Sequence, residues 1–569
     1  MNNGKPTVLA TFEDIQFELK DRIVKADDTW AKTLYKKSVS SKLVNDIKAQ
    51  LNMDCGRFDG VPEDANTRSE LYAPLVKLLN SIIGVSGNSK TRNGTRQAVS
   101  AKGKQLHKRV VESEVSPDIV FKATGSSFEL PRANRVPNVD AHVGYTNITT
   151  AIELRLDSTT NDVERTATKE VQRMCISAKE IFFQQPNRLF LYTLVVTEER
   201  VRLIQFDRAG VLYSPLFNYH DDPDTFIRIV VGLSSMDDAE LGLDTSVQFQ
   251  VIDMKALGTI RVLDPKTNEF TNYKMRSVDP FLRREELFGR GTRMWDVEDA
   301  DGTRLYVKDA WIDPNLTPEY IILLKAKGVK GVQQIVDYED RLGRPYGEIR
   351  YFRPRCDPDY FPFVNKCFQR LVTVRYGVGI TTRNKTEAEV LGALYDAIKA
   401  HERLLDSGIL HCDISLGNIL FGGPNAPDGL AGILIDLDLA IKTQHDKYPI
   451  DGRTTSWAHR LINTIGHGDQ EESAEAKRAF LASDLKLSII PEGWSKRCKT
   501  LVVAFHDFID NIVSEKEEIV GEMERAWEFS AMQVLHSQKR AHYQEVLDIF
   551  EAALPAHRAP LAHASRHNA

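Results

Sequence analysis

Apolar and polar residues alternate in short runs through the amino-terminal third of the chain. Runs typical of strands stand at 117–121, 149–155, 189–196 and 201–206. Helical spacing of apolar residues occurs at 67–82, again at 171–183, and weakly through Phe12, Ile15 and Leu19. Residues 84–110 are rich in Gly, Ser, Lys and Arg and are expected to form a basic loop. The pattern predicts a mixed α/β region.

Farther along, the pattern changes from strands to helices. A β-like run at 304–308 precedes a short helix predicted at 319–324. Thr386 and Glu389 form a capping-box pattern that begins a long helix ending near Gly408. An amphipathic helical pattern covers 501–554, and core packing is the commoner role for such a face.

Residues 409–441 combine two apolar runs with several polar side chains. Ile419-Leu-Phe421 and Ile433-Leu-Ile435 are separated by a turn rich in Gly, Pro, Asn and Asp, which predicts a hairpin. His411, Asp413 and Asn418 precede the hairpin, and Asp436 and Asp438 follow its second strand. A carboxylate can accept a proton from a hydroxyl, and carboxylate and amide oxygens are suitable ligands for Mg²⁺. Turn-capping Asp and Asn side chains are the structural alternative.

The motifs His411-Cys-Asp413-Ile-Ser415-Leu-Gly-Asn418 and Ile435-Asp436-Leu-Asp438-Leu-Ala440 resemble those of fungal-type protein kinases. The resemblance implies ATP and Mg²⁺ as cofactors and a protein with Ser/Thr hydroxyls as the substrate. It gives Asp413 the role of base, and it makes Asn418, Asp436 and Asp438 metal ligands. Asn418 and Asp436 also belong to the implied nucleotide site.

Upstream, Leu287-Phe-Gly289-Arg-Gly291 resembles the family's short phosphate-covering turn. Lys308 is then expected to contact the phosphates, and Glu319 to pair with it and orient it as part of the catalytic set. A hairpin turn, a solvated strand lysine and a helix-start glutamate are the structural alternatives.

The order of elements in the amino-terminal third is similar to that of the PD-(D/E)xK restriction-endonuclease-like fold. Glu70, Asp118 and Glu153 take the positions of its metal-binding carboxylates, and Arg155 replaces its lysine. An arginine is always charged and cannot act as a base. A degenerate nuclease-like module that binds a partner is therefore favoured over catalysis, and nucleic acid is one partner to consider.

Composition excludes several classes of protein. With 42% hydrophobic and 27% charged residues and a net charge of −6, the sequence is that of a globular chain without an overall attraction to nucleic acid. The six cysteines form no CxxC pair, which favours free thiols in a reducing compartment. No apolar run approaches the length of a membrane span, and no signal sequence is evident. We expect an intracellular protein, cytoplasmic or nuclear, that does not bind a membrane; its oligomeric state is left open.

Four departures from the kinase pattern keep other functions open. Cys412 replaces an arginine, Ser415 stands where many kinases have a lysine, and Asp438 replaces a glycine. The family's His-Asp-Leu-Glu segment does not occur after Arg453-Thr454, so part of the large lobe is expected to be missing. The alternatives are a pseudokinase acting as an interaction scaffold, or a small-molecule phosphotransferase of the aminoglycoside or choline kinase type.

The predicted fold is α+β: a bilobal protein-kinase-like domain with a shortened carboxy-terminal lobe, preceded by an α/β restriction-endonuclease-like module. The length of 569 residues requires more than one core. The predicted parts are a polar helical segment (1–60), the endonuclease-like module (61–240), a bridge (241–284), the kinase-like domain (285–515), a helical region (516–555) and a disordered tail (556–569).

Overall fold

The computed structural model describes residues 9–51, 53–54, 56–104, 106–128, 143–252, 255–264, 267–353, 363–382, 385–423, 426–442, 495–522 and 537–554. The chain divides into two compact units. Unit 1 comprises residues 1–316 and 336–373, and unit 2 comprises residues 317–335 and 374–569. The mixture of helices and sheets confirms an α+β protein. The predicted tail and the Arg453–Thr454 segment lie outside the described residues.

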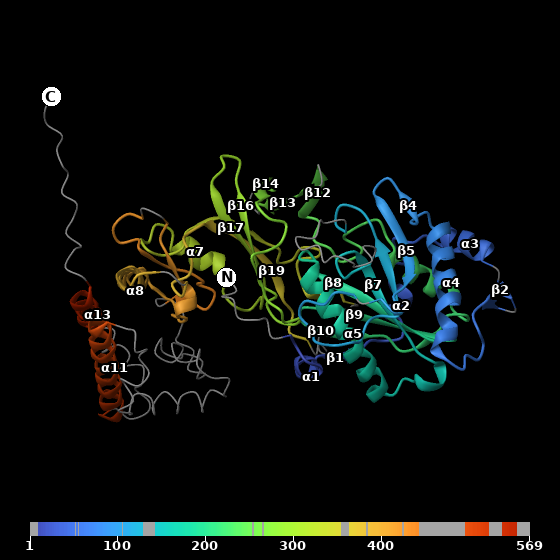
Figure 1. The fold of residues 1–569 in the computed structure, drawn as a ribbon, viewed down its shortest axis with the longest axis horizontal. Helices are drawn as coiled ribbons and strands as arrows, with labels where there is room; N and C mark the ends of the chain where they lie inside the picture. The colour runs from blue at the N-terminus through green and yellow to red at the C-terminus, as the bar shows by residue number, and fades with distance from the viewer. Residues whose placement is uncertain are drawn as a thin grey trace. The chain divides into compact units, whose positions relative to one another are not determined.

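Unit 1 contains a nine-stranded mixed sheet (Figure 1). Its order is β1 (Ile23–Lys25), β10 (Gly210–Tyr213), β9 (Arg200–Asp207), β8 (Phe190–Val196), β7 (Ile148–Leu154), β6 (Ile119–Ala123), β5 (Gly94–Ser100) and β4 (Lys90–Thr91), with β11 (Phe217–Asn218) beside β9. β7 and β8 are parallel because the helix α5 (Glu164–Gln184) connects them. The predicted strands and the helix between them are therefore confirmed.

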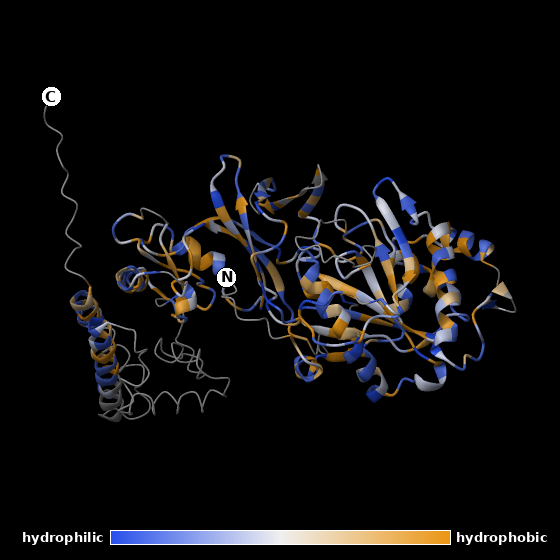
Figure 2. Ribbon diagram, in the orientation of Figure 1, coloured by the Kyte–Doolittle hydropathy of each residue, from blue (hydrophilic) through white to orange (hydrophobic). Residues whose placement is uncertain are grey.

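Each face of this sheet is covered by helices, which explains why the central strands β7 and β8 are buried at every position and mainly apolar. α1 (Phe12–Leu19) and α5 share a core with one face. α2 (Trp30–Thr33), α3 (Ser41–Gln50), α4 (Tyr72–Val85) and α6 (Pro223–Leu233) share a core with the other. In β8, Leu191 and Val195 belong to the first core and Tyr192 and Leu194 to the second. Figure 2 shows hydrophobic colour on these strands and on the helices that cover them.

The prediction of a basic loop at 84–110 is wrong. Residues Gly94–Ser100 form β5, which pairs antiparallel with β6 from Arg96↔Ala123 to Ser100↔Ile119. The strand itself is polar and begins with glycine, so its own sequence favours a loop. The apolar neighbour β6 supplies the pairing that the local sequence does not indicate.

A second, eight-stranded sheet has the order β12 (Val247–Ile252), β13 (Lys255–Leu263), β14 (Phe270–Met275), β16 (Arg293–Glu298), β17 (Arg304–Ile312), β19 (Cys367–Val374) and β18 (Ile335–Asp340), with β15 (Leu282–Arg283) beside β16. Residues 241–284, which the sequence presented as a bridge, supply four of its strands and part of its core. Lys308 lies on β17, in the interior of this sheet.

Unit 2 is mainly helical. α7 (Glu319–Lys325) precedes α8 (Glu387–Asp406), which the predicted Thr386–Glu389 capping box begins. α8 leads into β20 (Ile409–Leu410) and the hairpin of β21 (Ile419–Phe421) and β22 (Gly432–Leu434); β23 (Ile441–Lys442) pairs with β20. α11 (Lys496–Glu522) and α13 (Lys539–Ala553) pack on α8 through apolar faces, as the amphipathic pattern predicted. No helix among the described residues is long and apolar enough to cross a membrane.

Candidate functional site

The predicted hairpin brings Asn418 beside the residue that precedes Asp436. β21 and β22 pair antiparallel with Ile419 opposite Leu434, so the ends of both strands lie together. One step beyond this pair, the backbone N–H of Ile435 donates to the carbonyl oxygen of Asn418 at 3.0 Å. Alternating burial of Ile419 and Phe421 fixes the register. The hairpin that the sequence pattern predicts is therefore confirmed.

Asp413 is held by the neutral amide of Asn418. The Asn418 Nδ2 atom donates to the backbone oxygen of Asp413 at 2.9 Å and to its carboxylate Oδ2 at 3.0 Å. These two bonds fix the loop that lies between the residues. An amide donor leaves the negative charge of the carboxylate in place, which a proton acceptor requires.

His411 connects the loop of Asp413 to the strand end before Asp436. Its Nδ1 accepts the backbone N–H of Asp413 at 3.3 Å, and its Nε2 lies 3.1 Å from the carbonyl oxygen of Ile435. The first contact requires an unprotonated Nδ1, so Nε2 carries the hydrogen and donates it to Ile435. Burial lowers the pKa of His411, which keeps the ring neutral. No role for His411 follows from its sequence motif alone; in the structure its ring connects the two loops through hydrogen bonds.

Two residues of the site have the backbone conformation that L-residues seldom adopt. Cys412 has a φ of 60° and Asp436 a φ of 66°. Such strain at a non-glycine residue persists only where neighbouring contacts hold it. For Asp436 one of these contacts is Gln333, whose Oε1 accepts the Asp436 N–H at 3.3 Å. Gln333 was not predicted, because nothing in its local sequence marks it as a neighbour of Asp436.

Lys308 and Glu319 fall in different compact units, and their pairing stays a prediction. Lys308 is half-buried on β17, opposite Met294 of β16. The next residue, Asp309, is buried and accepts two hydrogen bonds from Arg370 of β19, at 2.7 and 2.8 Å. Glu319 is the first residue of α7 and is buried. The strand that carries Lys308 is thus fixed by a buried ion pair.

The turn with Gly289 and Gly291 packs on the amino-terminal part of unit 1. Gly289 has a φ of 112° and Gly291 a φ of 53°. A Cβ atom on Gly291 would lie 2.5 Å from Nε of Arg208, so the glycine is required by the close approach of that side chain. The backbone N–H groups of Leu287, Phe288 and Gly289 all donate to groups of this amino-terminal part.

Of the carboxylates of the predicted nuclease site, Glu153 and Asp118 form ion pairs, and the three do not form a metal site among the described residues. Glu153 is buried at the end of β7, and one of its oxygens contacts Arg155 at 2.8 Å and Arg173 at 2.6 Å. Burial raises the pKa of Glu153 and the two arginines oppose that shift. Asp118 contacts Arg68 at 3.4 Å and accepts a hydrogen bond from Tyr72. Glu70 instead caps its own turn through Thr67 and Asn66.

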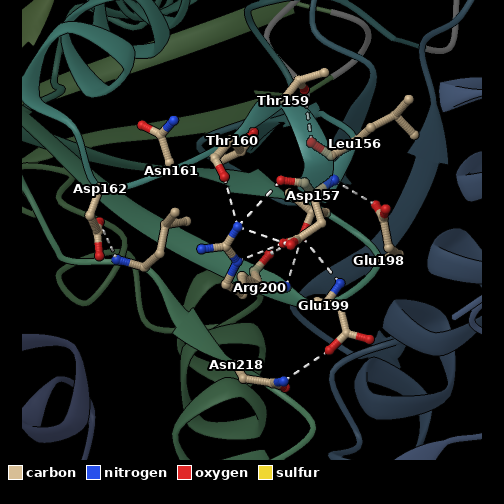
Figure 3. Close-up of polar contacts among 12 residues, drawn as sticks. Leu156, Asp157, Thr159, Thr160, Asn161, Asp162, Glu198, Glu199, Arg200 and Asn218 are labelled. Carbon is tan, nitrogen blue, oxygen red and sulfur yellow. Dashed lines mark hydrogen bonds and ion pairs between the residues drawn. The ribbon is translucent and has the colours of Figure 1, made fainter. Parts of the chain in front are cut away.

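Asp157, which follows β7, also has an arginine partner (Figure 3). Asp157 accepts two hydrogen bonds from Arg200, at 2.6 and 2.9 Å, and one from the hydroxyl of Thr197 at 2.9 Å. Arg200 also donates to the carbonyl oxygen of Thr160. Across the described part of the chain, no group of three or more His, Cys, Asp or Glu side chains converges on a metal position. The endonuclease-like module stays a prediction.

A family model described as fungal protein kinase matches residues 131–353 and 344–459, which together make up more than half of the chain. The match begins between β6 and β7 in the sequence and continues beyond Asp438, so it covers the motifs at 411–418 and 435–440 and the region upstream of them. Among curated proteins, none matches this sequence.

Proposed function

Because this chain belongs to the fungal protein kinase family, we propose that it transfers the γ-phosphate of ATP to Ser or Thr hydroxyls of a protein. Family membership places the chain among kinases, a class of transferases. The observation that carries the proposal is the assembly of Asp413, Asn418 and the strand end before Asp436, joined by the Asn418 amide and the His411 ring.

The donor groups in this assembly suit the cofactors that the family implies. Asn418 directs its amide nitrogen to Asp413, so the oxygen of the same amide is the atom that a cation would use. Asp436 and Asp438 add carboxylates from the adjoining loop. Mg²⁺ prefers such oxygen ligands, and a bound Mg²⁺·ATP would supply the phosphoryl group and neutralise its charge. We assign the metal to Asn418, Asp436 and Asp438, and the phosphates to Lys308, Gly289 and Gly291.

Asp413 is the residue proposed to orient the attacking hydroxyl and accept its proton. Two contacts support the role: the Asn418 amide fixes the carboxylate, and the His411 ring fixes the backbone N–H of the same residue. A neutral histidine leaves the negative charge on Asp413, whereas a cationic partner would lower its basicity. Glu319 is proposed to orient Lys308.

The proposal is tested by thermal unfolding of the full chain with ATP, in the presence and absence of Mg²⁺. A ligand that binds only the folded state at a hundredfold excess over its dissociation constant stabilises it by about 2.7 kcal/mol. We expect Mg²⁺-dependent stabilisation in the wild type and its loss in Asp436→Asn. The matched control is Asp157→Asn, which removes a carboxylate paired with Arg200 and should keep the stabilisation.

Absence of stabilisation in the wild type would overturn the proposal and favour the pseudokinase alternative. If stabilisation is present, incubation with radiolabelled ATP and a mixed protein substrate gives the second readout. Label in Ser or Thr residues supports a protein kinase. Label confined to small molecules such as aminoglycosides or choline would identify a small-molecule phosphotransferase instead.

A further inference from the structure

The Gly-x-Gly turn, residues 286–291, is attached to α1 by a carboxylate. Glu18 Oε1 accepts the backbone N–H of Leu287 and, at 3.1 Å, that of Phe288. The other oxygen of Glu18 pairs with Lys179 of α5, and both side chains are largely buried. The carboxylate therefore satisfies two amides of the turn and is itself fixed by a buried cation.

Arg208, at the turn between β9 and β10, holds the same segment from another direction. Its Nη1 atom donates to the carbonyl oxygens of Glu286 and Leu287, each at 2.9 Å. Its own carbonyl oxygen accepts the N–H of Gly289 at 2.9 Å. The guanidinium lies 4.9 Å from the ring centre of Phe182 and against Gly291. The side chain is 2% exposed, so this arginine is an internal support.

Apolar packing adds to these polar contacts. Leu287 and Phe288 are buried in the same core as Ile15 and Leu19 of α1. At the other end of the turn, the carbonyl oxygen of Arg290 accepts the N–H of Trp311, three residues beyond Lys308 on β17. The turn is thus bonded on one side to the amino-terminal α/β layer and on the other to the strand that carries Lys308.

We propose that the amino-terminal α/β layer is a fixed support for the Gly-x-Gly turn, and that Glu18 and Arg208 are positioning residues for nucleotide binding there. Glycine residues make the backbone of such a turn flexible. Contacts that fix the turn before the nucleotide binds reduce the entropy cost of binding. Here the amides of Leu287, Phe288 and Gly289 are used for that attachment. The role in nucleotide binding rests on the proposed function; the attachment itself does not.

The test compares two double variants that both remove the buried ion pair. Glu18→Gln with Lys179→Met keeps an oxygen acceptor for the amides of Leu287 and Phe288. Glu18→Met with Lys179→Met removes that acceptor. Glu13→Gln, on the exposed first turn of the same helix, is the control for a lost charge on α1.

The first readout is hydrogen exchange of a peptide covering residues 284–292, measured without nucleotide. We expect faster exchange at Leu287 and Phe288 only in the variant without the acceptor. Equal exchange in both double variants would overturn the attachment. Because this readout needs no ATP, it remains decisive if the wild type binds none.

The second readout is the dissociation constant of Mg²⁺·ATP. We expect the variant without the acceptor to bind about tenfold more weakly, because two amides lose their partner and the turn is released. The Glu18→Gln double variant should stay within about threefold of the wild type, a rescue that a purely structural role of the ion pair would not give.

Faster exchange with unchanged affinity would overturn the positioning role. A wild type that binds no ATP would overturn that role together with the proposed function, whereas faster exchange alone would still support the attachment.

Discussion

Carboxylates at two places in this chain lie at or near the end of a strand and differ in their partners. In unit 1, Glu153 pairs with Arg155 and Arg173, and Asp157 pairs with Arg200. In unit 2, Asp413 is held by the neutral amide of Asn418. An arginine neutralises a carboxylate and makes it part of the structure, whereas an amide orients it and leaves its charge available. Partner type, more than position, distinguishes the carboxylate that we propose to be catalytic from the structural ones.

The largest expected difference between the two groups is in phosphoryl transfer. We expect Asp413→Asn to lower kcat by about a thousandfold, since a positioned base contributes on the order of 10²–10⁴. Asp157→Asn should leave kcat unchanged and lower only stability, because Arg200 already neutralises that carboxylate. The measurement is transfer of radiolabelled phosphate to protein, alongside the affinity for Mg²⁺·ATP, which Asp413→Asn should leave nearly intact. Equal losses of kcat in Asp413→Asn and Asp157→Asn would contradict the distinction between carboxylates held by an amide and those paired with arginine.

The ion pairs of Glu153 provide the second contrast, in stability. Replacing both Arg155 and Arg173 by methionine leaves a buried carboxylate unpaired, and we expect a loss of about 3–5 kcal/mol in the free energy of unfolding. Adding Glu153→Gln to that variant should recover much of the loss, because the buried charge is then gone. Urea unfolding at pH 7 measures both effects. A double variant as stable as the wild type would show that the arginines do not support Glu153.

These contrasts also show what the sequence was able to predict. The hairpin, Asp413, Asn418 and the position of Asp436 follow from a pattern within thirty or so residues, and local spacing fixes their arrangement. The partners that decide their chemistry come from farther away. Gln333 is 103 residues from Asp436, and Glu18 is 269 residues from Leu287. Such contacts depend on tertiary packing, which a single sequence does not reveal.

The strand β5 illustrates the same limit for the fold. Its sequence, Gly94-Thr-Arg-Gln-Ala-Val-Ser100, is mostly polar and begins with glycine, which is depleted in strands. Pairing with β6 makes it a strand, and Arg96 is buried because it donates to the carbonyl oxygens of Thr124 and Ser235. Strong apolar periodicity, as in β8 or α8, predicted elements correctly. Where a neighbouring strand stabilises an element, as β6 does for β5, the local pattern does not predict that element.

A buried, neutral histidine in unit 2, His401, predicts that the stability of the folded state depends on pH. Burial, with His411 nearby, lowers the pKa of His401 on α8 to about 3, from an ordinary value of 6.5, and its Nδ1 contacts the hydroxyl of Tyr543 on α13. The unfolded chain therefore binds a proton below pH 6.5 that the folded chain does not. The contribution of neutral His401 to the free energy of unfolding is fully present above pH 6.5. It decreases as the pH falls toward 3, by up to about 1.4 kcal/mol per pH unit.

We expect His401→Phe to reduce this loss on acidification. The measurement is hydrogen exchange of peptides from α8 and α13 at pH 7.5 and pH 5.0, corrected for the intrinsic rate. Peptides from β8 in unit 1, which pairs with the strand that carries Glu153, provide the internal comparison, because Glu153 has arginine partners. An identical loss in the wild type and the variant would mean that another group, such as His411, carries the proton uptake.

The smallest expected effect concerns a feature that the two units share. α1 begins with a capping box formed by Thr11 and Asp14, and α8 begins with one formed by Thr386 and Glu389. In each, the threonine hydroxyl accepts a backbone N–H at 3.2 Å while the acidic side chain accepts the N–H of the threonine. We expect Thr11→Ala and Thr386→Ala each to lower the free energy of unfolding by about 1 kcal/mol.

The two substitutions differ in their consequences for function, because α8 leads directly to the loop of Asp413 and α1 carries Glu18. Thr386→Ala should lower kcat more than the affinity for Mg²⁺·ATP, and Thr11→Ala should do the reverse. The opposite pattern would mean that α1 supports the chemical residues and α8 the nucleotide.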